Sequence, residues 1–200
     1  MMQTELEKVS YAVGMSIADS LKNQNLEDID TQVLAEAMSD IFSGKNPKLT
    51  EQDANTAIQA FLDNKRNAAF AEVKLEGENF LSNNKNRSEI KTTASGLQYE
   101  SLTEGSGRKP AATDVVSVHY HGTLIDGTVF DSSVLRGTPA SFGVHQVIPG
   151  WTEALQLMSV GSKYKLYIPQ ELAYGANPHP GGAIKPFSAL IFEVELLDIK

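Results

Sequence analysis

The sequence predicts a mixed α+β protein. An all-helical N-terminal module and a long connecting helix precede a C-terminal antiparallel half-barrel sheet wrapped around one short helix. Two observations predict this order. Residues 1–90 hold one of the 8 prolines and three of the 15 glycines, whereas residues 91–200 hold the others. Apolar residues recur at helical spacing in the first part and alternate, as in strands, in the second.

The composition narrows the class of protein. A chain of 200 residues makes one large domain or two small ones, and 41% hydrophobic residues exclude wholesale disorder. Because cysteine is absent, disulfides, iron–sulfur clusters and thiolate zinc sites are excluded. A net charge of −8 argues against a nucleic-acid partner. The phosphate-binding and dinucleotide glycine motifs are missing, so we expect no cofactor.

The first twenty residues bear on where the protein is located. They include Glu5, Glu7, Lys8 and Asp19, and no apolar core follows a basic start, as it does in a secretory signal. No apolar run approaches the roughly 18–20 residues that span a bilayer. We therefore expect a cytoplasmic protein without a membrane partner.

Two amphipathic helices are predicted first. Helical spacing over Glu5 to about Asn23 predicts the first, with apolar residues at Leu6, Val9, Val13, Ile17 and Leu21. Asp30 or Thr31 can cap a second helix, and Gly44 is a natural stop for it.

A third helical segment follows Pro47. Thr50 starts it, with Asp53 three residues later as a weak capping box. The run from Glu51 to about Asn84 has no proline; if continuous, its roughly 34 residues form a rod of about 50 Å. We therefore divide the chain into a helical dimerisation module (1–48), a connecting helix and linker (49–91) and a C-terminal domain (92–200).

The helical module needs additional cover for its apolar side chains. The apolar stripes of the first two helices are too small for a stable core, because short domains bury little surface. The simplest remedy is a homodimer in which these helices pack across a two-fold axis. A monomeric three-helix bundle, or a helix docked on the C-terminal half, are the alternatives.

The C-terminal part alternates strands and turns. Alternation over Val115–Leu124 predicts a strand with Val116, Val118 and Tyr120 on one face, and Asp126-Gly127 is a hairpin-turn signal. A short helix is expected from Trp151 to Met158. Further strands are predicted at 96–99, 129–133, 163–168 and 189–199. The Gly/Pro-rich loop at 174–186 is long enough to be functional.

Two conventional catalytic arrangements receive little support. His119 and His121 share a strand face, but no third ligand has the spacing of a metal site, so a polar strand face is the favoured interpretation and no metal is expected. Ser132 or Ser133 with His179 and Asp131 would be needed for a hydrolase. The Gly-x-Ser-x-Gly nucleophile elbow of such enzymes is absent.

Six sequence blocks follow one another in the C-terminal part. The blocks are His119-Tyr120-His121-Gly122, Gly127-x-Val129-Phe130-Asp131-Ser132-Ser133, Gln146-Val147-Ile148-Pro149-Gly150-Trp151, Gln156-x-Met158-x-Val160-Gly161, Ala173-Tyr174-Gly175 and Ile191-Phe192-Glu193-Val194-Glu195-Leu196-Leu197. In this order they resemble the FKBP-type peptidyl-prolyl isomerases, and the resemblance runs from about Leu97 to the last residue. The helical half is similar to that of the dimeric bacterial 22-kDa and macrophage-infectivity-potentiator-like members.

This resemblance implies an apolar pocket that accelerates rotation about Xaa-Pro bonds by desolvation and twisted-amide binding. It implies catalytic roles for Tyr120, Phe130, Asp131 and Tyr174. It further implies that substrate or the macrolides FK506 and rapamycin contact Phe142, Val147, Ile148, Trp151, His179, Ile184 and Phe192.

The resemblance also implies how the two parts cooperate. A homodimer through the N-terminal helices would hold unfolded or Pro-containing clients between its arms, in the manner of a chaperone. The alternative function is a chaperone or adaptor that binds Pro-containing segments without significant catalysis.

Overall fold

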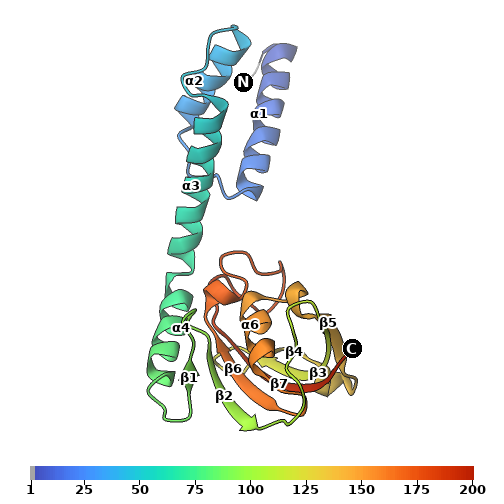
Figure 1. Ribbon diagram of the computed structural model, residues 1–200. Coiled ribbons are helices and arrows are strands. Elements are labelled where there is room, and N and C mark those ends of the chain that lie inside the picture. The colour runs from blue at the N-terminus through green and yellow to red at the C-terminus, as the bar shows by residue number, and fades with distance from the viewer. Residues whose placement is uncertain (1–2) are drawn as a thin grey trace. The chain divides into compact units, whose positions relative to one another are not determined.

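A computed structural model describes residues 3–200, so the first two residues of the predicted 1–48 module lie outside the described part. The chain divides into two compact units, one ending at Lys65 and the other comprising Arg66–Lys200 (Figure 1). We call them the helical unit and the sheet unit, and describe each by itself.

The helical unit begins with α1 (Glu5–Asn23) and α2 (Thr31–Phe42), at the positions predicted by the apolar spacing. Thr4 caps α1 in a reciprocal capping box with Glu7. Of the two candidate caps for α2, Asp30 is the one whose side chain accepts hydrogen bonds from the first turn. Capping of this kind is worth about 1 kcal/mol for each helix.

The apolar stripes of the helical unit remain largely uncovered. None of the residues in α1 or α2 is buried, and Leu6 and Phe42 are 75% and 83% exposed. Leu26, in the connection between the two helices, is buried. The unit therefore leaves apolar area in contact with water that a packed domain would cover.

The predicted continuous rod is interrupted. The structure has α3 (Glu51–Ala69) and α4 (Ala71–Asn84), separated at Phe70 (Figure 1). Phe70 has φ −118° and ψ 18°, outside the helical region, although its N–H still bonds the Arg66 carbonyl. Neither glycine nor proline marks this break, so the sequence pattern continued through it.

The sheet unit is built on seven antiparallel strands in the order β1-β2-β6-β7-β3-β4, with β5 also pairing with β3. This arrangement confirms the predicted fold class. The strands are β1 (Lys91–Thr92), β2 (Gln98–Thr103), β3 (Val115–Thr123), β4 (Val129–Ser132), β5 (Ala140–Gly143), β6 (Lys163–Ile168) and β7 (Leu190–Ile199).

Helix α6 (Pro149–Leu157) lies against the curved sheet (Figure 1). Pro149 occupies its first turn, where a missing N–H is tolerated. Val116, Val118 and Tyr120 are buried toward it, as the alternation in β3 predicted. Three shorter helices, α5 (Ser133–Arg136), η1 (Val144–Gln146) and η2 (Gln170–Leu172), also belong to the sheet unit, as does α4.

Helix α4 is joined to the sheet by buried polar contacts. Asn84 Nδ2 donates to Gln98 Oε1 at 2.9 Å, and both side chains are buried. Arg87, just beyond α4, donates to the Tyr167 hydroxyl and forms an ion pair with Glu100. Burial, together with the hydrogen bond to Glu100, raises the pKa of Tyr167 to about 12, so its hydroxyl stays protonated.

These contacts place α4 in the sheet unit, whereas the sequence assigned residues 49–91 to a connecting segment. A Cβ on Gly77 would lie 3.1 Å from that of Ala189, so α4 approaches the start of β7 closely. Such a contact between distant segments has no signature in the helical pattern. The functional three-part division remains a prediction.

Candidate active site

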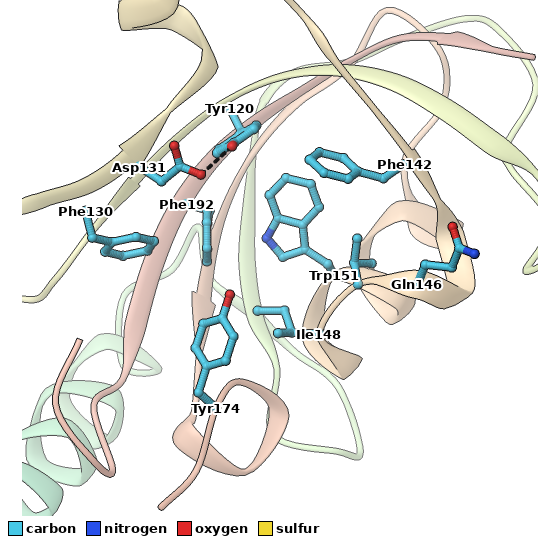
Figure 2. Close-up of a pocket in the computed structure, with 10 residues that line it drawn as sticks. Tyr120, Phe130, Asp131, Phe142, Gln146, Ile148, Trp151, Tyr174 and Phe192 are labelled. Carbon is cyan, nitrogen blue, oxygen red and sulfur yellow. Dashed lines mark hydrogen bonds between the residues drawn. The ribbon is translucent and has the colours of Figure 1, made fainter. Parts of the chain in front are cut away.

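A cavity of about 490 Å³ opens in the sheet unit, within the range of small-ligand sites (Figure 2). Its walls come from β3, β4, β5, η1, the start of α6, the loop after η2, and β7. The residues lining it are Tyr120, Phe130, Asp131, Phe142, Gln146, Val147, Ile148, Trp151, Tyr174 and Phe192.

Trp151 lies at the centre of a cluster of aromatic rings. Its indole meets Tyr120, Phe142 and Phe192 edge to face, with centroid distances of 5.4, 5.8 and 5.2 Å. Edge-to-face pairs of this kind are favourable and directional. The rings therefore stabilise one another in positions that surround the cavity rather than collapsing into it.

Gly122 on β3 makes room for two of these rings. A Cβ at this position would lie 2.7 Å from the Phe130 ring and 2.8 Å from the Phe192 ring. Real Cβ atoms do not approach rings so closely, so any larger residue would push them aside. The packing of Phe130 and Phe192 thus depends on a missing side chain.

A compact polar network edges the cavity. The Tyr120 hydroxyl donates to Asp131 Oδ2 at 2.5 Å, and Arg136 Nη2 donates to the same hydroxyl at 2.8 Å. Arg136 also forms an ion pair with Asp131. Burial on its own would raise the pKa of Asp131, but hydrogen bonds from Tyr120 and Arg136 outweigh it and lower the pKa.

The pKa of Tyr120 is shifted in the opposite direction to that of Asp131. Burial, followed by its hydrogen bond to Asp131, raises the pKa of the Tyr120 hydroxyl. At neutral pH the pair is therefore a neutral phenol and a carboxylate, held in place by the Arg136 guanidinium. This is a fixed hydrogen-bond arrangement rather than an acid and a base ready to exchange a proton.

Tyr174 supplies the other polar group. Figure 2 shows its hydroxyl pointing toward the aromatic rings of the cavity. Within residues 3–200 this hydroxyl has no hydrogen-bond partner, and the side chain is 43% exposed. It is therefore a donor available to a bound molecule.

Most of the residues named from the sequence meet at this cavity. The structure brings together nine of them: Tyr120, Phe130, Asp131, Phe142, Val147, Ile148, Trp151, Tyr174 and Phe192. His179 and Ile184 do not line it; they line an adjoining groove that shares Tyr174 with the cavity. The roles of all eleven remain proposals.

Sequence reasoning missed two residues at the site. Gln146 lines the cavity from η1, although it belongs to a motif already singled out. Arg136 was overlooked because its helix, α5, has only 4 residues. The Ser132 cap and Gly137, with φ 68°, were the available signals for a helical turn there.

The two rival arrangements are not assembled. His119 and His121 each place Nδ1 near a serine hydroxyl, Ser133 at 3.1 Å and Ser132 at 3.0 Å. His179 lies instead in the adjoining groove. Across residues 3–200, no three His, Asp or Glu side chains gather in a way that would hold a metal ion.

Comparison with known proteins gives two family matches that together span nearly the whole chain. Residues 106–197 match the FKBP-type peptidyl-prolyl cis-trans isomerase family, and residues 6–100 match the domain amino-terminal to it.

Individual relatives agree. The chain is 46% identical to Outer membrane protein MIP of Legionella longbeachae, over 98% of this chain and 87% of that protein. It is 45% identical to the FKBP-type 22 kDa peptidyl-prolyl cis-trans isomerase of Escherichia coli, over 96% and 94%. The crystal structure of FkpA from Escherichia coli matches with a TM-score of 0.65 and 37% identity, over 100% and 99% of the two chains.

The expectation of a cytoplasmic location is overturned, because a relative similar over 98% of the chain is named an outer membrane protein. The expectation rested on charged residues near the start and on the lack of an apolar run, and these features do not determine location. None of the helices within residues 3–200 is long and apolar enough to cross a membrane.

Proposed function

The chain belongs to the FKBP-type peptidyl-prolyl cis-trans isomerases, and from that premise we propose how its cavity lowers the barrier to rotation about Xaa-Pro bonds. The observation that carries the proposal is an open hollow lined mainly by aromatic and aliphatic side chains, with few polar groups at its edge. Such a site fits a five-membered imino-acid ring and its neighbouring peptide bond.

The barrier itself is amide resonance. Rotation about the bond before proline meets a barrier of roughly 18–20 kcal/mol, although the trans form is favoured by only about 0.5–1 kcal/mol. Crossing it requires no proton transfer and no nucleophile. A site with a fixed Tyr120–Asp131–Arg136 network therefore suffices chemically.

Desolvation lowers this barrier. Water stabilises the planar, strongly dipolar amide more than the twisted one, whose carbonyl is less polarised. An apolar cavity around Trp151 and Phe142 removes that advantage when the peptide enters. Preferential binding of the twisted form then accelerates rotation, as any catalyst complementary to a transition state does.

The polar groups hold the substrate carbonyls. The Tyr174 hydroxyl donates to one carbonyl, while Asp131 orients Tyr120 through its hydrogen bond. The alternative role for Asp131 is a direct contact with the carbonyl carbon of the rotating bond. On the loop side, the backbone N–H of Ile184 binds a further carbonyl. FK506 and rapamycin compete for the same cavity.

Ile148 offers a matched test of desolvation. Its side chain lines the cavity, and leucine is an apolar isomer of isoleucine that can serve as the control. We expect Ile148→Asn to lower kcat/KM for a short Xaa-Pro peptide by about tenfold, and Ile148→Leu to change it by less than about threefold. Both variants are compared for stability by thermal unfolding. Equal losses in two folded variants would contradict the desolvation mechanism.

A second role is supported by the helical unit. The exposed apolar faces of α1 and α2, including Leu6 and Phe42, fit a homodimer whose arms retain unfolded clients. Holding a client near the cavity raises its effective concentration there. Clients are proteins with exposed apolar and Pro-containing segments.

Sedimentation tests the dimer, and refolding tests the holding role. We expect Leu6→Asp with Phe42→Asp to give a monomer that isomerises short peptides normally but accelerates proline-limited refolding roughly tenfold less or worse. A monomer that matches the unmodified chain in refolding would refute the holding role. A dimer that survives both substitutions would refute the proposed interface.

A further inference from the structure

A second hollow, of about 720 Å³, lies between the α3–α4 junction and the loop after η2. Arg66 and Phe70 line it from the junction, and His179 and Lys185 line it from the loop. Tyr174 lines both this hollow and the cavity, so the two adjoin at that side chain. We call the hollow the loop groove.

The loop that forms one wall is clamped at its base. Phe187 N–H donates to the Gly175 carbonyl at 2.8 Å, which joins the two ends of the loop next to Tyr174. Phe187 is 8% exposed and has φ 63°, a conformation that bulky residues rarely adopt. Lys74 of α4 lies over its ring at 5.9 Å. Surrounding packing must hold such a residue in place.

A hydrogen bond also joins the loop after η2 directly to the α3–α4 junction. Arg66 Nη1 donates to Asn177 Oδ1 at 2.8 Å, across the groove from one side to the other. Together with the clamp at Phe187, this contact gives the loop groove a defined shape. A side chain entering it would meet an organised surface.

The charges in the groove have one sign. Arg66 and Lys185 line it together with His179, and none of the described residues lining it carries a carboxylate. This contrasts with the chain as a whole, whose net charge is −8. Asp126, an exposed residue near Lys185, does not line the groove.

We propose that the loop groove binds a carboxylate side chain of the client, a few residues from the proline and on one side of it. The proposal rests on the proposed function, in which the proline itself occupies the cavity. Because the cavity and the loop groove adjoin at Tyr174, one client segment reaches both. The isomerase then favours segments in which Asp or Glu lies near the proline.

The test uses the full chain and nine-residue peptides with one central Xaa-Pro bond. Glu, Gln and Lys are placed in turn two, three or four residues before or after the proline. At one or more positions on a single side, we expect Glu to raise kcat/KM about threefold or more over Gln, and Lys to lower it. Raising the salt to about 0.5 M should shrink the difference, because exposed charges are then screened.

Lys185→Gln and Lys109→Gln form a matched pair of variants. Both remove one positive charge, but Lys109 is exposed and does not line the loop groove. We expect the Glu-to-Gln ratio of kcat/KM to fall toward one in Lys185→Gln and to stay unchanged in Lys109→Gln.

Three outcomes would overturn the proposal in distinguishable ways. A ratio near one at every position, with normal turnover of the Gln peptides, would remove the groove's role and leave the isomerase intact. A ratio that survives Lys185→Gln and Arg66→Gln would place acid recognition elsewhere. No turnover of any peptide would refute the proposed function itself.

Discussion

The helical unit and the sheet unit handle their apolar residues in opposite ways. In α1 and α2 no residue is buried, whereas Leu97, Val116 and Met158 of the sheet unit have no exposed surface at all. Burial of apolar area is the main favourable term in folding. The sheet unit therefore has a buried core of its own, whereas the helical unit leaves its apolar faces exposed.

Cutting the chain between Lys65 and Arg66 would test this difference most severely. We expect fragment 66–200 to fold cooperatively as a monomer with peptide activity within about twofold of the full chain. The fragment ending at Lys65 should lack a stable monomeric fold, because short domains bury too little surface. Circular dichroism measures folding, sedimentation measures the oligomeric state, and a peptide assay measures the activity.

The opposite pattern would break the comparison. A helical fragment that unfolds cooperatively as a monomer, or a fragment 66–200 that is unfolded, would mean that the two units depend on each other for stability.

A smaller effect would sharpen where the sheet unit begins. Asn84→Ala leaves the buried Gln98 Oε1 without its donor, which costs about 1–3 kcal/mol of unfolding free energy. Urea unfolding of fragment 66–200 measures the loss. Lys85→Ala, at an exposed neighbour, serves as the control.

The double variant Asn84→Leu with Gln98→Leu should recover part of that loss, since no buried polar group is left unpaired. If Asn84→Ala leaves the unfolding free energy unchanged, the buried Asn84–Gln98 contact does not contribute to the stability of the sheet unit.

Variants of the cavity should separate catalysis from assembly. We expect Asp131→Leu and Phe142→Ala to lower kcat/KM for a short Xaa-Pro peptide by about tenfold, equivalent to about 1.4 kcal/mol of transition-state stabilisation. Oligomeric state should be unaffected, because both side chains lie in the sheet unit. Leu102→Ala, outside the cavity lining, should retain activity.

Unchanged rates in folded Asp131→Leu or Phe142→Ala would remove that residue from the mechanism. A change in sedimentation would show instead that the cavity and the assembly of the chain are coupled.

The smallest expected effect is a pH dependence in the sheet unit. The pKa of Asp131 is lowered from its ordinary value of 3.8, so its contribution to stability is present above that value and is lost as the pH falls through the lowered pKa. Because the side chain is partly exposed, the contribution is on the order of a few tenths of a kcal/mol.

Thermal unfolding of fragment 66–200 between pH 5 and 2 measures this contribution of Asp131 to stability. In Asp131→Asn the melting temperature should fall slightly less as the pH is lowered. Asp198→Asn, at a residue that forms no ion pair within residues 3–200, should not show this change. The same fall of melting temperature with pH in the unmodified fragment and in both variants would show that the Asp131 ion pair contributes no stability.

Local patterns predicted the regular elements well, because their signals are local too. The alternation in β3 and the capping of α2 by Asp30 depend on residues close in sequence. Elements of four residues, such as β5 and α5, are too short to show a period. The break at Phe70 lacked any glycine or proline to reveal it.

The site was predictable to a similar degree. The order of motif blocks gathered most of its side chains, but Arg136 joins through a contact with Asp131 that no spacing encodes. His179 and Ile184 line the loop groove instead of the cavity, because the path of an irregular loop depends on contacts such as that of Phe187 with Lys74.

Gly122 gives the enzyme an unusual vulnerability. Adding one methyl group there would displace the Phe130 and Phe192 rings from the cavity wall without adding or removing any polar group. Catalysis could thus be silenced by filling space alone, leaving surface charge, hydroxyls and assembly interfaces intact. A variant altered in this way would keep its charged and polar groups but would no longer isomerise Xaa-Pro bonds.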